Sequence, residues 1–109
     1  MALVHAQPLD VISVRPLAAQ LHGVKTHSLL KTGKLQLMRL VLAAGQHVPE
    51  HQVPGEITIH CLEGEVVVST PGLARTLGAG ELMALPGQEP HALQAVTDAS
   101  LLVTILLHP

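Results

Sequence analysis

The feature that most constrains the fold of this 109-residue chain is its division into short aliphatic runs separated by turn residues. Runs rich in Leu, Val and Ile alternate with Gly, Pro or Asp at intervals of roughly 8–12 residues, a spacing typical of antiparallel β proteins. No stretch combines a sustained helical period with capping residues at both ends. The sequence therefore predicts one all-β domain over residues 1–109, either a sandwich or a barrel.

The predicted strands are residues 10–15, 25–31, 35–43, 57–62, 65–70, 73–77, 81–85, 92–97 and 100–107. Residues 1–8 are expected to form a loose N-terminal arm and residues 17–21 a helical turn. The best-defined hairpin turns at Pro71 and Gly72, because these two residue types favour a tight reversal between strands.

Composition excludes several classes of partner. The chain has 6 Lys and Arg against 8 Asp and Glu, so it carries no basic surface suited to nucleic acid or to an anionic membrane. It is 48% hydrophobic yet contains no Phe, Tyr or Trp, so the core must be aliphatic. A pocket in such a core offers no aromatic face for stacking sugars or bases.

The single cysteine, Cys61, rules out an internal disulfide and is typical of a reducing compartment. It lies in an aliphatic strand, where a cysteine usually acts as a small core residue. The N-terminus has no basic region before an apolar run, which argues against a signal peptide. We therefore expect a cytoplasmic protein.

The last predicted strand, residues 101–107, is apolar on both of its faces. In so small a domain, one face of this strand would be exposed to water unless something covered it. This pattern predicts a homodimer, formed by strand exchange or by packing of sheets near the chain termini.

Residues 45–64 hold most of the polar chemistry, with three His, three Glu, two Pro and three Gly. A turn carries His51 and Glu56, and a strand of alternating character follows, with His60 expected on its outer face. Glu63, at the corner after this strand, is expected to be solvated. A second segment, residues 78–91, repeats the Gly, Pro and His pattern, so we expect two turns to face each other across a small barrel.

Within these segments, the residues resemble the first motif of the small single-domain cupins. That motif is a Gly, five residues, His-x-His, three or four residues, Glu, six residues and Gly. This chain matches it at Gly45, His51 and Gly64, whereas Val53 stands at the second histidine and Ile57 at the glutamate. The neighbouring Glu56 would reach the inner face only if a bulge shifted the strand register.

The second cupin motif is a Gly, five residues, Pro-x-Gly, two residues, His, three residues and Asn. It is matched at Gly80, Pro86 and His91, with the inner glycine displaced to Gly87 and Ala95 in place of the asparagine. The resemblance covers residues 34–107 and implies an antiparallel jelly-roll β-barrel. The same fold serves enzymes, binding modules and storage proteins, so it does not by itself give the function.

The resemblance also implies a divalent transition metal, Zn, Fe, Mn or Ni, at the barrel mouth. Metal-binding cupins use three histidines and one glutamate, and by position this chain retains only His51 and His91. His47, four residues before His51, is the candidate third ligand because both would share one face of a regular strand. Glu56 and Arg39 are further candidates for contact with a ligand, with an ion pair at the sheet edge as the alternative for Arg39.

Two functions follow from these residues. The first is a small-molecule-binding barrel with a depleted two-histidine metal site at its mouth. The alternative is a metal-dependent enzyme, similar to dioxygenases or isomerases, that acts on a small substrate.

Overall fold

The computed structural model describes residues 5–107, so the first four residues of the predicted N-terminal arm lie outside the described part. Its elements are one short 3-10 helix, η1 (Ala18–Gly23), and nine strands: β1 (His27–Lys31), β2 (Leu35–Leu42), β3 (His47–His51), β4 (Ile57–Glu63), β5 (Glu65–Thr70), β6 (Leu73–Gly78), β7 (Leu82–Leu85), β8 (His91–Ala95) and β9 (Ala99–Leu106).

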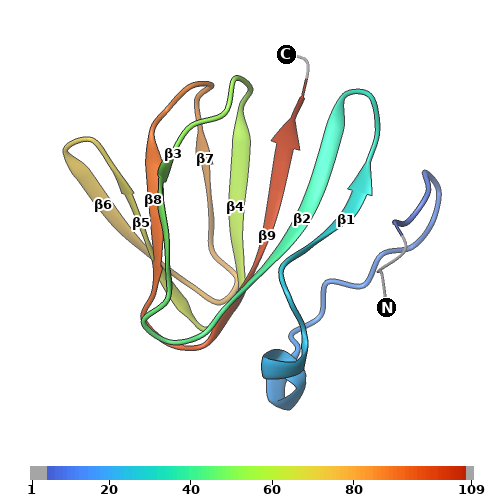
Figure 1. Cartoon of the computed structure of the whole chain (residues 1–109), viewed down its shortest axis with the longest axis horizontal. Helices are drawn as coiled ribbons and strands as arrows, with labels where there is room; N and C mark the ends of the chain where they lie inside the picture. The colour runs from blue at the N-terminus through green and yellow to red at the C-terminus, as the bar shows by residue number, and fades with distance from the viewer. Residues whose placement is uncertain (1–4, 108–109) are drawn as a thin grey trace.

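The strands form two antiparallel sheets that face each other (Figure 1). One sheet has the order β1-β2-β9-β4-β7 and the other the order β3-β8-β5-β6. Strands that are neighbours in a sheet are mostly distant in sequence, because the chain crosses repeatedly from one sheet to the other. The predicted all-β jelly-roll barrel is confirmed.

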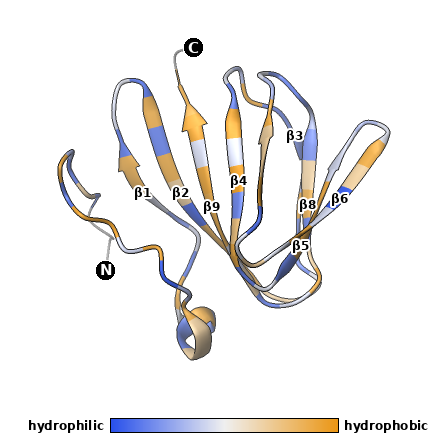
Figure 2. Cartoon of the chain, turned by 180° about the vertical axis from the view of Figure 1, so that it is seen from behind, coloured by the Kyte–Doolittle hydropathy of each residue, from blue (hydrophilic) through white to orange (hydrophobic). Residues whose placement is uncertain are grey.

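The interior is aliphatic because the central strands alternate between buried hydrophobic residues and more polar ones, and Figure 2 shows this alternation of hydropathy along β4. On β4, Ile57, Ile59 and Cys61 are 5%, 1% and 0% exposed, and His60 between them lies on the outer face. Burial raises the pKa of the Cys61 thiol, which leaves it protonated and inert within the core. The period-2 pattern of the sequence therefore places this strand correctly.

The outer face of the five-stranded sheet is also poor in charge. Its two central cross-strand rows are Arg39, Leu102, His60 and Leu82 in one, and Leu37, Thr104, Thr58 and Ala84 in the other. Arg39 is buried, whereas Leu82 is 57% exposed. These two rows thus present mainly leucine and threonine side chains rather than the charged residues usual on a solvated sheet.

The N-terminal segment departs from the sequence prediction. Residues 10–15 form no strand, because no neighbouring strand pairs with them along their length. Leu9 and Val11 are almost fully exposed, and Ala6 donates its backbone N–H to the carbonyl of Leu29. The β-branched residues here resemble a strand in composition only.

The segment predicted as a turn around His51 contains strand β3, which lies at the edge of the four-stranded sheet. Pro49 is compatible with this position because an edge strand has backbone groups that need no partner. No helix among residues 5–107 is long and apolar enough to cross a membrane.

Candidate functional site

A cavity of about 330 Å³ lies between the two sheets. Ten apolar residues line it: Met38, Leu40, Leu42, Val48, Val53, Ile57, Ile59, Leu93, Val103 and Ile105. Its other lining residues are Thr26, Gln46, His51 and His91. No Asp, Glu, Lys or Arg contributes to this lining, so the cavity is aliphatic and carries no permanent charge.

The structure brings His51 and His91 together at this cavity. They are cross-strand partners on β3 and β8, and their ring centroids lie 4.3 Å apart at an interplanar angle of 57°. His91 is 3% exposed, whereas His51 is exposed to solvent. The pair therefore forms a polar corner in an otherwise apolar cavity, with one ring buried and the other open to water.

Each ring is held in the same tautomer by the backbone carbonyl two residues before it. Nδ1 of His51 lies 3.1 Å from the carbonyl oxygen of Pro49, and Nδ1 of His91 lies 2.9 Å from that of Glu89. A carbonyl oxygen only accepts, so Nδ1 must donate and Nε2 of each neutral ring keeps its lone pair. Within the described residues, no protein group bonds to either Nε2, so both remain available to an occupant of the cavity.

His47, the predicted third ligand, does not join this pair. It is exposed and does not line the cavity, whereas the next residue, Val48, does. The pairing of β3 with β8 shifts register between Val48 and His51, as a β-bulge does. The alternation from which the sequence placed His47 and His51 on one face is broken by this shift.

Glu56 does not line the cavity either. It is exposed at a separate depression of about 230 Å³ on the outside of the barrel, together with Thr58 and Thr104. Its neighbour Ile57 occupies the inward position.

Arg39 lies on the outer face of β2 and is 5% exposed. Its Nη2 donates to the carbonyl oxygen of Arg15 and to Ser100 Oγ (3.4 Å), and it lies 3.8 Å from Glu63 Oε2. Of the two roles that the sequence left open for Arg39, the structure therefore shows the ion pair.

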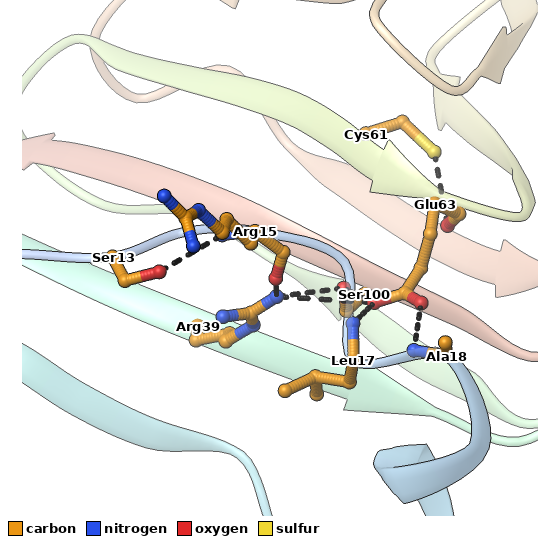
Figure 3. A network of polar contacts seen from close by, with 8 residues as sticks. All are labelled: Ser13, Arg15, Leu17, Ala18, Arg39, Cys61, Glu63 and Ser100. Atoms are coloured by element: carbon orange, nitrogen blue, oxygen red, sulfur yellow. Dashed lines mark hydrogen bonds and ion pairs between the residues drawn. The ribbon is translucent and has the colours of Figure 1, made fainter.

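The carboxylate of Glu63 is the centre of this outer network, drawn in Figure 3. Its Oε2 accepts the backbone N–H of Leu17 at 2.7 Å and the hydroxyl of Ser100, and its Oε1 accepts the N–H of Ala18 at 2.9 Å. The expectation that Glu63 is solvated is wrong, because its side chain is only 15% exposed. Nothing in the sequence marks this role, since a register shift between Cys61 and Glu63 places the carboxylate there.

The environment of Glu63 favours its charged form. Burial alone would raise the pKa of this carboxyl. Stronger opposing effects come from the N–H of Leu17, the Ser100 hydroxyl, the N–H of Ala18 and the Arg39 guanidinium, so the net pKa lies below the ordinary value of 4.5. The network holds residues 15–18 against the sheet and has no access to the cavity. Its role is therefore structural.

The fold agrees with comparisons to known proteins. The family model described as "Cupin domain" matches residues 38–107. The structure is similar to a cupin superfamily protein from Desulfitobacterium hafniense, with a TM-score of 0.78 and 19% identity over 94% of this chain and 100% of that one. The comparison with curated proteins gives no match.

Two further solved structures show the same fold. A conserved protein of unknown function from Streptococcus pyogenes has a TM-score of 0.77 and 20% identity over 100% of this chain and 99% of that one. KdgF from a Halomonas species has a TM-score of 0.69 and 19% identity over 77% and 80% of the two chains. The domain match, which spans well over half of the residues, shows that the chain belongs to the cupin family.

Proposed function

We propose that this cupin is a small-molecule-binding protein, in which the aliphatic cavity takes the apolar body of a ligand and the histidine pair holds its polar end. The observation that carries the proposal is the lining of the cavity, which has ten apolar residues, two imidazoles and no charged group. Each CH₂ group transferred from water into such a space gains about 0.8 kcal/mol. A charged ligand body would gain nothing comparable, because no opposite charge compensates its desolvation.

A transition-metal cofactor does not fit the donor set of this cavity. Zinc and iron centres use three or four protein ligands, whereas His51 and His91 supply two. Val53 and Ile57, which stand where the cupin motif has its other ligands, line the same cavity with hydrocarbon side chains. Among residues 5–107, no cluster of three or more His, Cys, Asp or Glu side chains is suited to hold a metal ion.

The alternative function, a metal-dependent enzyme of dioxygenase or isomerase type, is favoured by one observation. The carbonyl contacts at Nδ1 of both histidines are those that orient imidazole ligands in metal centres. Such a centre would require the missing donors to come from the bound molecule or from water. We expect any metal to be held weakly for this reason.

The proposal is tested by titrating the protein with two neutral six- and seven-carbon probes, hexanamide and 2-heptanone. Binding is followed by NMR on the methyl groups of the lining residues Ile59, Leu93 and Val103. We expect saturable shifts at these methyls, and we expect Leu40→Phe, which fills the cavity from β2, to weaken both probes at least about fivefold.

Leu37→Phe is the matched control, because Leu37 lies on the same strand but on the outer face. It should leave the affinity for both probes unchanged. If neither probe shifts the cavity methyls at its solubility limit, or if Leu40→Phe folds and binds both probes as the parent does, the cavity is not a binding site.

A further inference from the structure

From the tautomers of the histidine pair we infer the class of ligand: a neutral molecule whose polar end carries two hydrogen-bond donors, such as a primary amide or a diol. This inference rests on the proposed binding function and adds the chemistry of the ligand's head group. Carboxylates, esters and ketones are excluded as preferred head groups, although all would fit the cavity by size.

The position of the proton on each ring is fixed by the backbone. The carbonyl oxygens of Pro49 and Glu89, at 3.1 and 2.9 Å from the two Nδ1 atoms, require a proton on each Nδ1. In the neutral rings, both Nε2 atoms are then acceptors. An occupant of the cavity meets two lone pairs, so its polar end must supply two N–H or O–H groups.

The excluded head groups fail for a definite physical reason. The oxygens of a ketone, ester or carboxylate present lone pairs, which repel the lone pairs at Nε2 of His51 and His91. A cationic donor would satisfy both nitrogens, but no carboxylate lines the cavity to compensate its charge. Thr26 Oγ1 is already paired with the N–H and the carbonyl oxygen of Val41, and Gln46 Oε1 accepts the N–H of Ala43 at 3.1 Å. The free NH₂ group of Gln46 could donate equally to the carbonyl oxygen of an amide or of a ketone, so it does not distinguish between them.

The two histidines should contribute unequally. His51 is exposed, so water can satisfy its Nε2 when the ligand does not. His91 is 3% exposed, so a ligand without a donor leaves its Nε2 without a partner in an apolar surrounding. An unpaired buried acceptor of this kind costs about tenfold in affinity. His91 is therefore the main determinant of head-group specificity.

The test compares three probes with the same five-carbon tail: hexanamide, 2-heptanone and hexanoate. Hexanamide and 2-heptanone are nearly isosteric, since a methyl group replaces the NH₂ group, and hexanoate carries only acceptors. Affinities are measured at pH 8 by titration of the cavity methyl groups. We expect hexanamide to bind at least about tenfold more tightly than either other probe.

Variants assign the preference to the rings. His91→Leu should reduce the ratio of hexanamide to 2-heptanone affinity to about threefold or less, and His51→Leu should reduce it by a smaller factor. His91→Gln is a second variant for the case that His91→Leu does not fold. Its side-chain amide can donate, so it should bind 2-heptanone more tightly than the parent does.

His27→Leu is the matched control. Nδ1 of His27 makes the same contact with the carbonyl two residues before it, that of Lys25 at 2.6 Å, but His27 does not line the cavity. The parent ratio should persist in this variant.

Two results separate the inference from the proposed function. Equal binding of hexanamide and 2-heptanone, or tighter binding of hexanoate, overturns the donor requirement and leaves the cavity as a binding site. Failure of all three probes to bind overturns the proposed function itself. A tenfold preference that survives unchanged in both His91 variants would also overturn the inference, because the preference would then arise elsewhere.

Discussion

Replacement of Glu63 by glutamine tests whether one carboxylate holds the N-terminal segment on the barrel. The substitution keeps the shape of the side chain but converts one acceptor oxygen into an NH₂ group. Because Oε2 meets both the N–H of Leu17 and the Ser100 hydroxyl, the glutamine should retain its oxygen there and turn its NH₂ toward Ala18. One donor then faces another, and one hydrogen bond is lost.

The magnitude follows from these contacts. A hydrogen bond to a charged group contributes about 1.5–3 kcal/mol, and Arg39, buried 3.8 Å away, also loses its counter-charge. Together these losses amount to about 2–4 kcal/mol. We expect the amides of Leu17 and Ala18 to exchange with solvent at least about 30-fold faster, since 1.4 kcal/mol corresponds to a factor of ten. The melting temperature should fall by about 10–20 °C if the segment and barrel unfold together.

The assay is hydrogen exchange by NMR, with thermal unfolding followed by circular dichroism of the peptide groups because the chain has no aromatic side chain. Glu65→Gln is the control, since within residues 5–107 the Glu65 carboxylate has no hydrogen-bond partner. A fall in melting temperature with unchanged protection of Leu17 and Ala18 would refute the reasoning.

The lowered pKa of Glu63 also predicts that the attachment of the N-terminal segment depends on pH. The pKa of Glu63 is lower in the folded chain than its ordinary value of 4.5. Its stabilising contribution is therefore complete above pH 4.5 and is lost as the pH falls through the lower folded value. Protection of the Leu17 amide should decline in that acid range in the parent protein and stay low and flat in Glu63→Gln.

Three other predictions concern metal binding, assembly and backbone geometry. Protein loaded with Zn²⁺ should lose most of the metal on dialysis, and elemental analysis should find no zinc in His51→Leu or His91→Leu. Stoichiometric retention of zinc by the parent would show a stronger site than two imidazoles provide. The two central rows on the outer face of the five-stranded sheet carry leucine, threonine and alanine side chains that a second copy could cover, so sedimentation should give a dimer at micromolar concentration and a monomer for Leu102→Glu. Gly64→Ala should abolish soluble folded protein on expression, because φ is +81° there and a Cβ would overlap the carbonyl oxygen of Asp98; a folded variant with the parent's melting temperature would contradict this.

The strands could be predicted where local chemistry decides them. On β4, the alternation of Ile57, Thr58 and Ile59 fixes both the strand and its buried face. The turn at Pro71 and Gly72 joins β5 to β6 as expected, and Gly72 adopts the left-handed φ of 75° that its residue type permits. The strand predicted over residues 10–15 is absent because a strand also requires a neighbouring strand to pair with, and composition does not reveal one.

The polar residues were harder to predict because two register shifts decide their faces. The shift after Val48 separates His47 from His51, and the shift after Cys61 turns Glu63 toward the N-terminal segment. A bulge depends on how two distant strands align, so neither shift is visible in one strand's own pattern. The apposition of His51 and His91 followed from two turn-bearing segments, whereas their shared tautomer required the atomic positions of the carbonyls.

The network on the outer face recognises the N-terminal segment through its main chain alone. Arg39 binds a carbonyl oxygen, and Glu63 binds two amide groups, so no side chain between residues 15 and 18 takes part in these contacts. These contacts therefore place little constraint on the side chains of residues 15–18, although Ala18 has a φ of +51°, in the left-handed region that bulky and β-branched residues avoid. Proline at position 17 is the informative exception: the φ of −82° there suits it, yet it would remove one of the two donors. The side chains that this attachment requires are therefore those of Arg39 and Glu63 on the sheet, and not those of the segment that they hold.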